Sequence, residues 1–372
     1  MKVSIVLPNL NFGGAERLHL NLAEDWIKKG HQVEFVLMQK EGEYLSLISP
    51  KINIVSLKVL RLRNIILPLA RYLRKSSSDI VLVAMWPLTS YALISWVLSG
   101  RIGKIFVSDH VHLSVSTSEE SHFLNLFLKY LIRFTYPIAS GVIAVSRGVR
   151  KDLSKLSNIN VKKIKVIYNP IAKEDPCFPA TQDERTKVWG GNYFYNILTV
   201  AELKKEKDHE MLIKAFSLLP SNLNAKLIIL GSGQLRDHLI SLIGELNLTE
   251  RVELPGFVHD PSQWYRTADL FVLSSRWEGF GNVIVEALEC GVPVVSTRSG
   301  GPTEILNDGA YGKLVPVGDC NALATAMEES FGALHDHELL RNRAQDFSIS
   351  LISDKYLNYF ATNEKVAEFY NR

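Results

Sequence analysis

The sequence of 372 residues predicts an α/β protein built from two doubly wound domains, each with its own parallel sheet. Short apolar runs alternate with longer stretches of helical periodicity along most of the chain. This pattern pauses once, near residue 170, and then starts again. The chain is also too long for one ordinary hydrophobic core, so its length alone favours two domains.

The first half opens with a strand–helix–strand unit. Residues 3–7 form a short apolar run, Gly13 and Gly14 form a turn, and apolar residues recur at helical spacing over 15–29. The next strand is expected at 32–38. Such a unit is the start of a parallel doubly wound sheet. Further strands are expected at 80–84, 104–108 and 141–145.

Residues 80–100 contain no charged side chain and are numerous enough to cross a bilayer. Pro87, Thr89 and Ser90 interrupt them, so we expect a buried strand, a turn and a core helix from about Thr89. A membrane span is the less favoured alternative. The apolar run at the N-terminus is too short for a signal peptide. We therefore expect a cytoplasmic protein that is peripheral at the inner face of the plasma membrane.

The second half repeats the strand and helix pattern. Strands are expected at 196–200, 226–231, 251–254, 270–273 and 292–297. We expect an N-terminal domain over 1–170, a linker over 171–190, a C-terminal domain over 191–350, and a helix over 351–372 that packs back on the first domain. Two such domains facing each other leave a cleft at the carboxyl ends of their strands, where ligands bind.

Charge is distributed unevenly although the net charge is only +3. Residues 1–165 carry 23 Lys and Arg against 11 Asp and Glu, which indicates an anionic partner for this half. Residues 59–75 and 123–134 mix basic and large apolar side chains, a composition typical of segments on anionic membranes. A core helix with a solvated basic rim is an equal alternative. Nucleic acid is disfavoured because no recognised binding motif accompanies the charge.

The three cysteines are few, odd in number and far apart: Cys177, Cys290 and Cys320. They predict a reducing compartment, and neither a disulfide framework nor a zinc site.

The most informative motif lies between Glu278 and Glu286, which stand eight residues apart across a Gly-Phe-Gly turn. A helix-forming stretch starts after the turn and stops at Gly291, so Glu278 belongs to a loop and Glu286 to a helix. Two carboxylates and a helix N-terminus suit a sugar that bears a phosphate. Without further context, these residues would more often be a loop charge and a solvated helix face.

The chain resembles the retaining glycosyltransferases of family 4, which have the GT-B fold of two Rossmann-like domains around a central cleft. The resemblance rests on Glu278…Glu286, on the run 268–275 before it, and on the run 300–306 after it. The Gly-Gly pair near the N-terminus and Asn169-Pro170 fit as well. The ordered set is far more specific than the acidic pair alone.

The resemblance implies a nucleotide-sugar domain at 191–350 and an acceptor domain at 1–170. It implies that Glu286 holds the donor ribose, that Glu278 contacts the donor sugar, and that Lys207 faces the diphosphate. His110 is implied to lie near the transferred sugar. The remaining implied donor contacts are Phe280, Gly281, Asn282 and Val283, the base-contacting loop at Phe257 and Val258, and the glycine loop at Gly13 and Gly14.

One position departs from the family pattern. Glu202 stands where the family has an arginine that helps to clamp the diphosphate. Either Lys204 or Lys205 replaces that arginine, or the clamp is weaker; both lysines are more often solvated than bound.

The implied activity is transfer of a hexose or N-acetylhexosamine from a nucleotide sugar, with a UDP-sugar favoured over a GDP-sugar, and with no metal or other cofactor. The expected acceptor is a lipid-linked or growing surface glycan, as in O-antigen, capsule or exopolysaccharide assembly. A nucleotide-sugar epimerase on the same fold and a non-catalytic sugar-binding protein remain alternatives. A nicotinamide dehydrogenase is disfavoured because the first strand does not lead to Gly-x-Gly-x-x-Gly.

Overall fold

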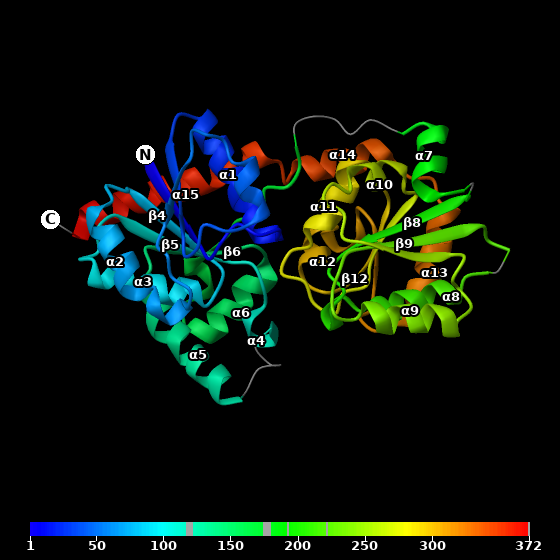
Figure 1. Cartoon of the computed structure of the whole chain (residues 1–372), viewed down its shortest axis with the longest axis horizontal. Coiled ribbons are helices and arrows are strands. Elements are labelled where there is room, and N and C mark those ends of the chain that lie inside the picture. Colours follow the sequence, from blue (N-terminus) through cyan, green and yellow to red (C-terminus); the bar gives the residue numbers. More distant parts are fainter. Residues whose placement is uncertain (117–121, 174–179, 192, 221, 371–372) are drawn as a thin grey trace. The chain divides into compact units, whose positions relative to one another are not determined.

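The computed structural model describes residues 1–116, 122–173, 180–191, 193–220 and 222–370. The chain divides into two compact units: unit 1 comprises Met1–Ile171 and Ile349–Arg372, and unit 2 comprises Ala172–Ser348. Each unit contains one parallel sheet with helices on its faces (Figure 1). The prediction of two Rossmann-like α/β domains is confirmed.

Unit 1 has a seven-stranded sheet in the order β3-β2-β1-β4-β5-β6-β7, and its paired strands are parallel. Its strands are β1 (Lys2–Leu7), β2 (Gln32–Leu37), β3 (Asn53–Ser56), β4 (Ile80–Ala84), β5 (Lys104–Asp109), β6 (Gly141–Ala144) and β7 (Ile164–Val166). Its helices are α1 (Gly14–Lys28), α2 (Ile66–Lys75), α3 (Leu88–Leu98), α4 (Leu113–Ser116), α5 (His122–Thr135), α6 (Arg147–Ser157) and α15 (Ile349–Tyr370).

The strands of this sheet are apolar because helices cover both faces. β4 is buried at all five residues, and β1 at five of its six. The strand order reverses between β1 and β4, so the carboxyl ends of these two strands form the switch point at which such sheets bind ligands.

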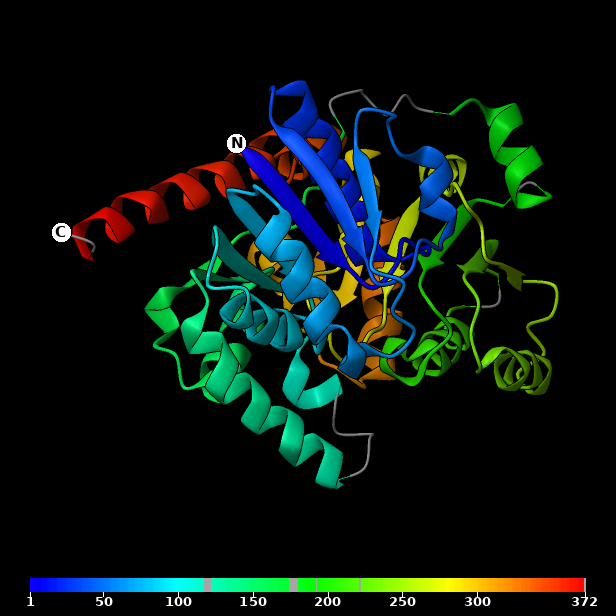
Figure 2. The same ribbon diagram turned by 60° about the vertical axis from the view of Figure 1, so that its left-hand side comes forward.

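The last helix of the chain belongs to the core of unit 1. Tyr356 and Phe360 of α15 are fully buried and pack edge-on against Trp26 of α1. Phe360 also contacts Phe106 of β5. Both views show α15, in red, alongside α1 (Figure 1, Figure 2). Burying aromatic side chains of this size contributes about 1.5–3 kcal/mol each, so α15 is an integral part of this unit.

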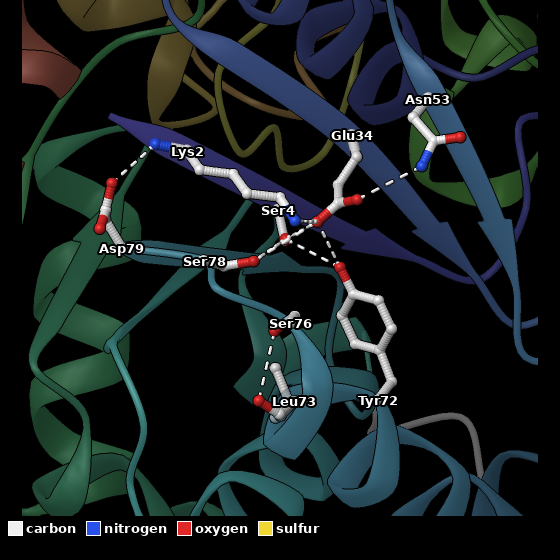
Figure 3. A network of polar contacts seen from close by, with 9 residues as sticks. All are labelled: Lys2, Ser4, Glu34, Asn53, Tyr72, Leu73, Ser76, Ser78 and Asp79. Carbon is white, nitrogen blue, oxygen red and sulfur yellow. Dashed lines mark hydrogen bonds and ion pairs between the residues drawn. The ribbon is translucent and has the colours of Figure 1, made fainter.

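A buried polar network joins α2 to the sheet of unit 1 (Figure 3). Glu34 of β2 is 5% exposed and accepts hydrogen bonds from Ser4 at 2.7 Å and from Tyr72 at 2.5 Å. Lys2 forms an ion pair with the same carboxylate at 3.1 Å. Burial opposes ionisation of Glu34, but the bonds from Tyr72, Ser4 and Lys2 outweigh it and lower the pKa of Glu34. The network thus holds a charged carboxylate between strand and helix.

The uncharged stretch 80–100 forms β4 and α3, joined by a turn at residues 85–87. The prediction of a strand, a turn and a core helix is confirmed. Among the described residues, no helix combines the length and the apolar character that a membrane span requires.

Unit 2 has a six-stranded sheet in the order β10-β9-β8-β11-β12-β13, again with parallel pairing. Its strands are β8 (Tyr195–Val200), β9 (Ala225–Leu230), β10 (Val252–Gly256), β11 (Leu270–Leu273), β12 (Val294–Thr297) and β13 (Lys313–Val315). Its helices are α7 (Gln182–Trp189), α8 (His209–Ser217), α9 (Arg236–Glu245), α10 (Ser262–Thr267), α11 (Asn282–Glu289), α12 (Gly301–Ile305), α13 (Cys320–Phe331) and α14 (His337–Gln345).

The structure adds three short edge or near-edge strands that the sequence did not predict: β3, β7 and β13. It also forms α7 inside the segment 171–190; residues 174–179 of that segment, with Cys177, lie outside the described residues. The sequence predicted no disulfide framework; Cys290 is disulfide-bonded, whereas Cys320 is a free thiol. Spacing along a sequence cannot report which side chains meet after folding.

Candidate active site

An ion pair spans the switch point of the second sheet. Lys207 follows β8, Glu278 follows β11, and these strands are neighbours where the strand order reverses. Lys207 Nζ lies 2.5 Å from Glu278 Oε1, with side-chain exposures of 22% and 11%. Parallel strands bring their carboxyl ends to one edge, so residues 71 positions apart meet there.

Hydrogen bonds from the neighbouring loops fix Glu278. Ser275 Oγ donates to Glu278 Oε1 at 2.7 Å, and the Glu278 amide donates to the carbonyl of Ser299 at 2.8 Å. Thr297 Oγ1 donates to the carbonyl of Ser275 at 2.5 Å. Lys207 and Ser275 both bond to Oε1 of Glu278, so Oε2 keeps its capacity to accept a hydrogen bond.

The helix α11 begins directly after the Gly-Phe-Gly turn. Gly281 is its N-cap residue and has a φ of 103°, a backbone conformation that residues other than glycine rarely adopt. Phe280 is 3% exposed and packs on Phe347, so the turn is anchored in the core. Asn282 and Val283 form the first turn of α11, where the positive end of the helix dipole favours anions.

Glu286 lies on α11, one turn further along. Tyr265 of α10 donates its hydroxyl to Glu286 Oε2 at 2.8 Å. Tyr265 itself is 2% exposed and contacts Phe271 of β11. The carboxylate is therefore oriented by a side chain that cannot move freely.

Two further predicted positions lie at the same edge of the second sheet. Phe257 and Val258 follow β10, and Phe257 is 56% exposed. Glu202 follows β8 and pairs with Lys204 at 2.8 Å, with side-chain exposures of 54% and 44%. Lys204 is thus partly neutralised by the acid that stands at the place of the family's arginine.

The glycine loop of unit 1 follows β1. Gly13 is the N-cap residue of α1, and Gly14 is its first residue. A side chain at position 13 would begin 2.2 Å from a carboxylate oxygen of Glu16, so the Glu16 side chain would have to shift to make room for it. Glu16 is 8% exposed, and burial is the main cause of its raised pKa.

His110 lies just beyond β5 and forms an edge-to-face pair with His19 of α1, with ring centroids 5.4 Å apart. Burial, and then the proximity of His19, lowers the pKa of His110 to about 3, although a hydrogen bond with Asn169 opposes this. Burial likewise lowers the pKa of His19 to about 4. Its Nδ1 donates to the carbonyl of Ala15 at 2.7 Å, so the neutral ring presents Nε2 as an acceptor.

Asp109 is the last residue of β5 and directly precedes His110; it is 1% exposed. Tyr136 donates its hydroxyl to Asp109 Oδ2 at 2.6 Å, and Thr89 bonds the same hydroxyl at 2.8 Å. Burial raises the pKa of Asp109 to about 7 against the opposing bond from Tyr136. Within the described part of the chain, Asp109 Oδ1 and His19 Nε2 are buried without a hydrogen-bond partner.

The predicted residues fall into one group in each unit. Lys207, Glu278 and the start of α11 come together in unit 2; Gly13, Gly14 and His110 lie at the strand ends of unit 1. Sequence reasoning missed Glu16, His19 and the role of Tyr265. For His19 there was a signal: it is a polar residue on the apolar face of the predicted helix.

Comparison with known protein families agrees with this architecture. The family "Glycosyl transferases group 1" matches residues 191–345, and "Glycosyltransferase Family 4" matches residues 12–175.

Characterised relatives and solved structures point the same way. The N-acetylgalactosamine-N,N'-diacetylbacillosaminyl-diphospho-undecaprenol 4-alpha-N-acetylgalactosaminyltransferase of Campylobacter jejuni is 31% identical over 331 residues, which covers 87% of this chain and 88% of that protein. A second transferase from that organism, which acts on a GalNAc-GalNAc-diNAcBac-PP-undecaprenol, is 26% identical over 97% of this chain and 98% of its own length. The structure of Anabaena HepE in complex with UDP aligns with a TM-score of 0.78 at 22% identity, over 97% of this chain and 100% of that one.

The two doubly wound domains have the GT-B fold, and the family matches and the Campylobacter relative define the class as glycosyltransferase. The chain belongs to glycosyltransferase family 4 within that class, as its match to the family and its 31% identity with the Campylobacter transferase establish.

Proposed function

We propose that this protein is a retaining glycosyltransferase that moves a hexose or N-acetylhexosamine from a nucleotide sugar, preferably a UDP-sugar, to a lipid-linked or growing surface glycan. The observation that carries the proposal is the Lys207–Glu278 pair beside the start of α11 at the switch point of the second sheet. It combines a cation and a helix N-terminus for a diphosphate with a carboxylate for sugar hydroxyls.

Breaking the bond between sugar and diphosphate builds negative charge on the leaving group. Lys207 has three N–H donors, so it can keep its bond to Glu278 and still contact a phosphate oxygen. The amides of Asn282 and Val283 add fixed dipoles. Preorganised donors of this kind lower the barrier because they need no reorientation during the reaction. We propose that these groups act without a bound metal.

Each carboxylate has a separate proposed role. Glu278 contacts hydroxyls of the donor sugar through Oε2, and Glu286 holds the hydroxyls of the ribose. Tyr265 supports this assignment because its bond to Glu286 Oε2 orients the carboxylate. We expect Glu286→Ala mainly to weaken donor binding, and Glu278→Gln to reduce turnover more strongly. Wild-type transfer rates in both variants would contradict the assignment.

In unit 1, the neutral His110 ring is proposed to contact the transferred sugar, and the loop at Gly13 and Gly14 to contact the diphosphate or the acceptor. A neutral imidazole both donates and accepts a hydrogen bond, which suits a sugar hydroxyl. For retention, we propose front-face attack by the acceptor, whose proton passes to the departing diphosphate.

The acceptor is proposed to be lipid-linked because relatives of this chain act on undecaprenol-linked glycans. A surface of unit 1 supports the same idea. Residues 58–75 contain six Lys and Arg and no acidic residue. Leu60 and Leu67 are 83% and 58% exposed there, next to the exposed Arg63 and Arg71. Exposed leucines among unopposed cations suit an anionic bilayer, so we propose peripheral attachment at the cytoplasmic membrane face.

Liposome flotation tests this attachment. We expect salt-sensitive binding to vesicles with anionic lipid, and loss of that binding in Arg63→Gln/Arg71→Gln. The matched control, Lys162→Gln/Lys163→Gln, removes two cations from an exposed turn elsewhere in the unit. Equal flotation of both double variants, or none in the wild type, would contradict a membrane role for this surface.

Thermal unfolding in the presence of UDP, GDP, ADP and NAD tests the donor class. A ligand that binds only the native state stabilises it by about 2.7 kcal/mol at a hundredfold excess over its Kd. We expect a shift with UDP that is reduced in Glu286→Ala. A shift with GDP alone would change the donor to a GDP-sugar, and a shift with NAD alone would contradict the proposed function.

A further inference from the structure

A second cavity in unit 2 lies away from the proposed donor site. It has a volume of about 400 Å³ and is lined by residues at the amino ends of β8, β11 and β12, including Tyr195, Asp269 and Pro293. The donor residues stand at the carboxyl ends of the same strands. In a parallel sheet the amino ends and the carboxyl ends of the strands lie on opposite sides, so this cavity is separate from the donor site.

Cations outnumber anions in the lining. Arg185, Arg266 and Arg341 face one carboxylate, Asp269. Arg185 already satisfies that carboxylate with two bonds at 2.7 and 2.6 Å, and the amide of Asn196 adds a third at 2.8 Å. Asp269 is therefore occupied by Arg185. Arg266 forms an ion pair with Glu184 at 3.7 Å, and Arg341 is balanced by neither carboxylate.

Arg341 of α14 is the least compensated of these cations. It is partly buried, and among the described residues its guanidinium has no hydrogen bond or ion pair; its Nε is fully enclosed. Gly291 makes room for it, since a side chain there would begin 3.1 Å from Arg341 Nη2. A partly buried guanidinium with an enclosed Nε and no partner is costly, and its planar fork matches the oxygens of a phosphate.

Two histidines stand beside Arg341 in this lining. His337, one helical turn earlier on α14, donates from Nδ1 to the carbonyl of Gly291 at 2.7 Å. His335 donates from Nε2 to the carbonyl of Ser330 at 2.7 Å. Each ring is fixed by one nitrogen and keeps the other for a ligand. Next to these polar groups, Tyr195 and Phe331 are stacked at 4.1 Å and form an apolar wall.

We propose that this cavity binds a small phosphate-bearing molecule, with Arg341 holding the phosphate and the aromatic wall contacting the rest. The site is independent of the proposed donor site, because no residue of the Lys207–Glu278 group lines it. A charge-assisted, two-pronged bond from Arg341 is the main source of affinity.

Calorimetric titration of the full chain with inorganic phosphate and pyrophosphate, at constant ionic strength set with chloride, tests the proposal. We expect saturable binding that persists in Lys207→Met, which disables the donor edge. In the Lys207→Met background, this binding should be lost in Arg341→Gln and weakened about tenfold in Arg341→Lys, which keeps the charge but not the fork. The control Arg298→Gln removes an exposed arginine of the same unit that is 4.0 Å from Asp308 and should bind like the wild type.

Three results would overturn the proposal. The first is binding that disappears in Lys207→Met and survives in Arg341→Gln, which would assign the phosphate to the donor edge. The second is equal binding by every variant, which would indicate an unspecific surface effect. The third is no saturable binding by the wild type. If Arg341→Gln does not fold, Arg341→Lys and His337→Ala decide between these outcomes.

Discussion

Two buried polar clusters lie in the same unit and differ in how completely they are bonded. The first cluster surrounds Glu34 of β2, close to the start of β1. Ser4 and Tyr72 donate hydrogen bonds to one carboxylate oxygen of Glu34, and Lys2 forms an ion pair with the same oxygen. Asn53 donates to the other oxygen at 3.5 Å (Figure 3). This cluster keeps its carboxylate charged, since its bonds lower the pKa of Glu34.

The cluster at the other end of the strands is incomplete. Asp109 Oδ1 and His19 Nε2 are enclosed without a hydrogen-bond partner in the described part of the chain. Burial raises the pKa of Asp109 to about 7 and lowers the pKa of both His19 and His110. Here burial favours the neutral forms.

The difference supports our proposal that one cluster serves stability and the other serves a ligand. A buried polar atom without a partner costs about 1–3 kcal/mol, so a ligand that completes its bonding recovers part of that cost. The Glu34 cluster needs nothing more, and it fastens α2 to the sheet. The cluster around His110 lies at the carboxyl ends of the strands, and we propose that a sugar hydroxyl completes its bonding there.

The largest expected effect is on turnover. His110→Ala removes the proposed contact with the transferred sugar, so we expect transfer to slow about hundredfold while the thermal midpoint changes by only a few degrees. Release of nucleoside diphosphate in the presence of acceptor measures this. His112→Ala is the matched control, and equal rates for the two variants would remove His110 from the site.

Glu34→Gln should have the converse effect. The variant keeps the shape of the side chain but loses the charge that Lys2 and Tyr72 face, so unfolding should become easier by about 2 kcal/mol. Urea denaturation measures this, with the exposed Glu41→Gln as control. A loss of transfer rate per folded molecule would mean that the Glu34 cluster is not purely structural.

The next largest effect is on how the free energy of unfolding depends on pH, to which the His19 side chain of the second cluster contributes. His19 is neutral in the native state down to about pH 4, but it gains a proton near pH 6.5 when unfolded. Its contribution is therefore fully present above pH 6.5 and is lost as the pH falls towards 4, by up to about 1.4 kcal/mol per pH unit.

His19→Leu should accordingly flatten the decline of the unfolding free energy between pH 6.5 and 4. Urea titrations across this range measure the slope, with His238→Leu, an exposed position, as the control. An unchanged slope would show that His19 titrates normally in the native state.

The smallest expected effect is in unit 2, where the same logic applies to Glu286. Tyr265→Phe removes the hydroxyl that orients the carboxylate, so UDP should bind about fivefold more weakly. Calorimetric titration measures this, and Tyr193→Phe is the control. Equal affinities in the two variants would mean that the hydroxyl of Tyr265 does not support donor binding.

The sequence predicted the fold class and most strands because parallel sheets covered on both faces require continuous apolar runs, as at 80–84 and 270–273. It missed β3 and β13 because strands of three or four partly exposed residues carry little pattern.

The candidate site was only partly accessible from the sequence. The turn before α11 is local, so the order Glu278-Gly-Phe-Gly predicted it. The Lys207–Glu278 bond depends on β8 and β11 becoming neighbours, and the His19–His110 pair depends on how α1 packs. No local pattern specifies such contacts between distant segments.

The most direct test of the account is acceptor-dependent release of UDP from UDP-N-acetylhexosamines and UDP-hexoses, with an undecaprenyl-diphosphate-linked glycan as acceptor. For the wild type, we predict release of UDP together with a lengthened lipid-linked glycan, and release at least about hundredfold slower in Lys207→Met. Two results would contradict the account: a UDP-sugar that binds but releases no UDP with any acceptor, and a UDP-sugar that is epimerised when no acceptor is present.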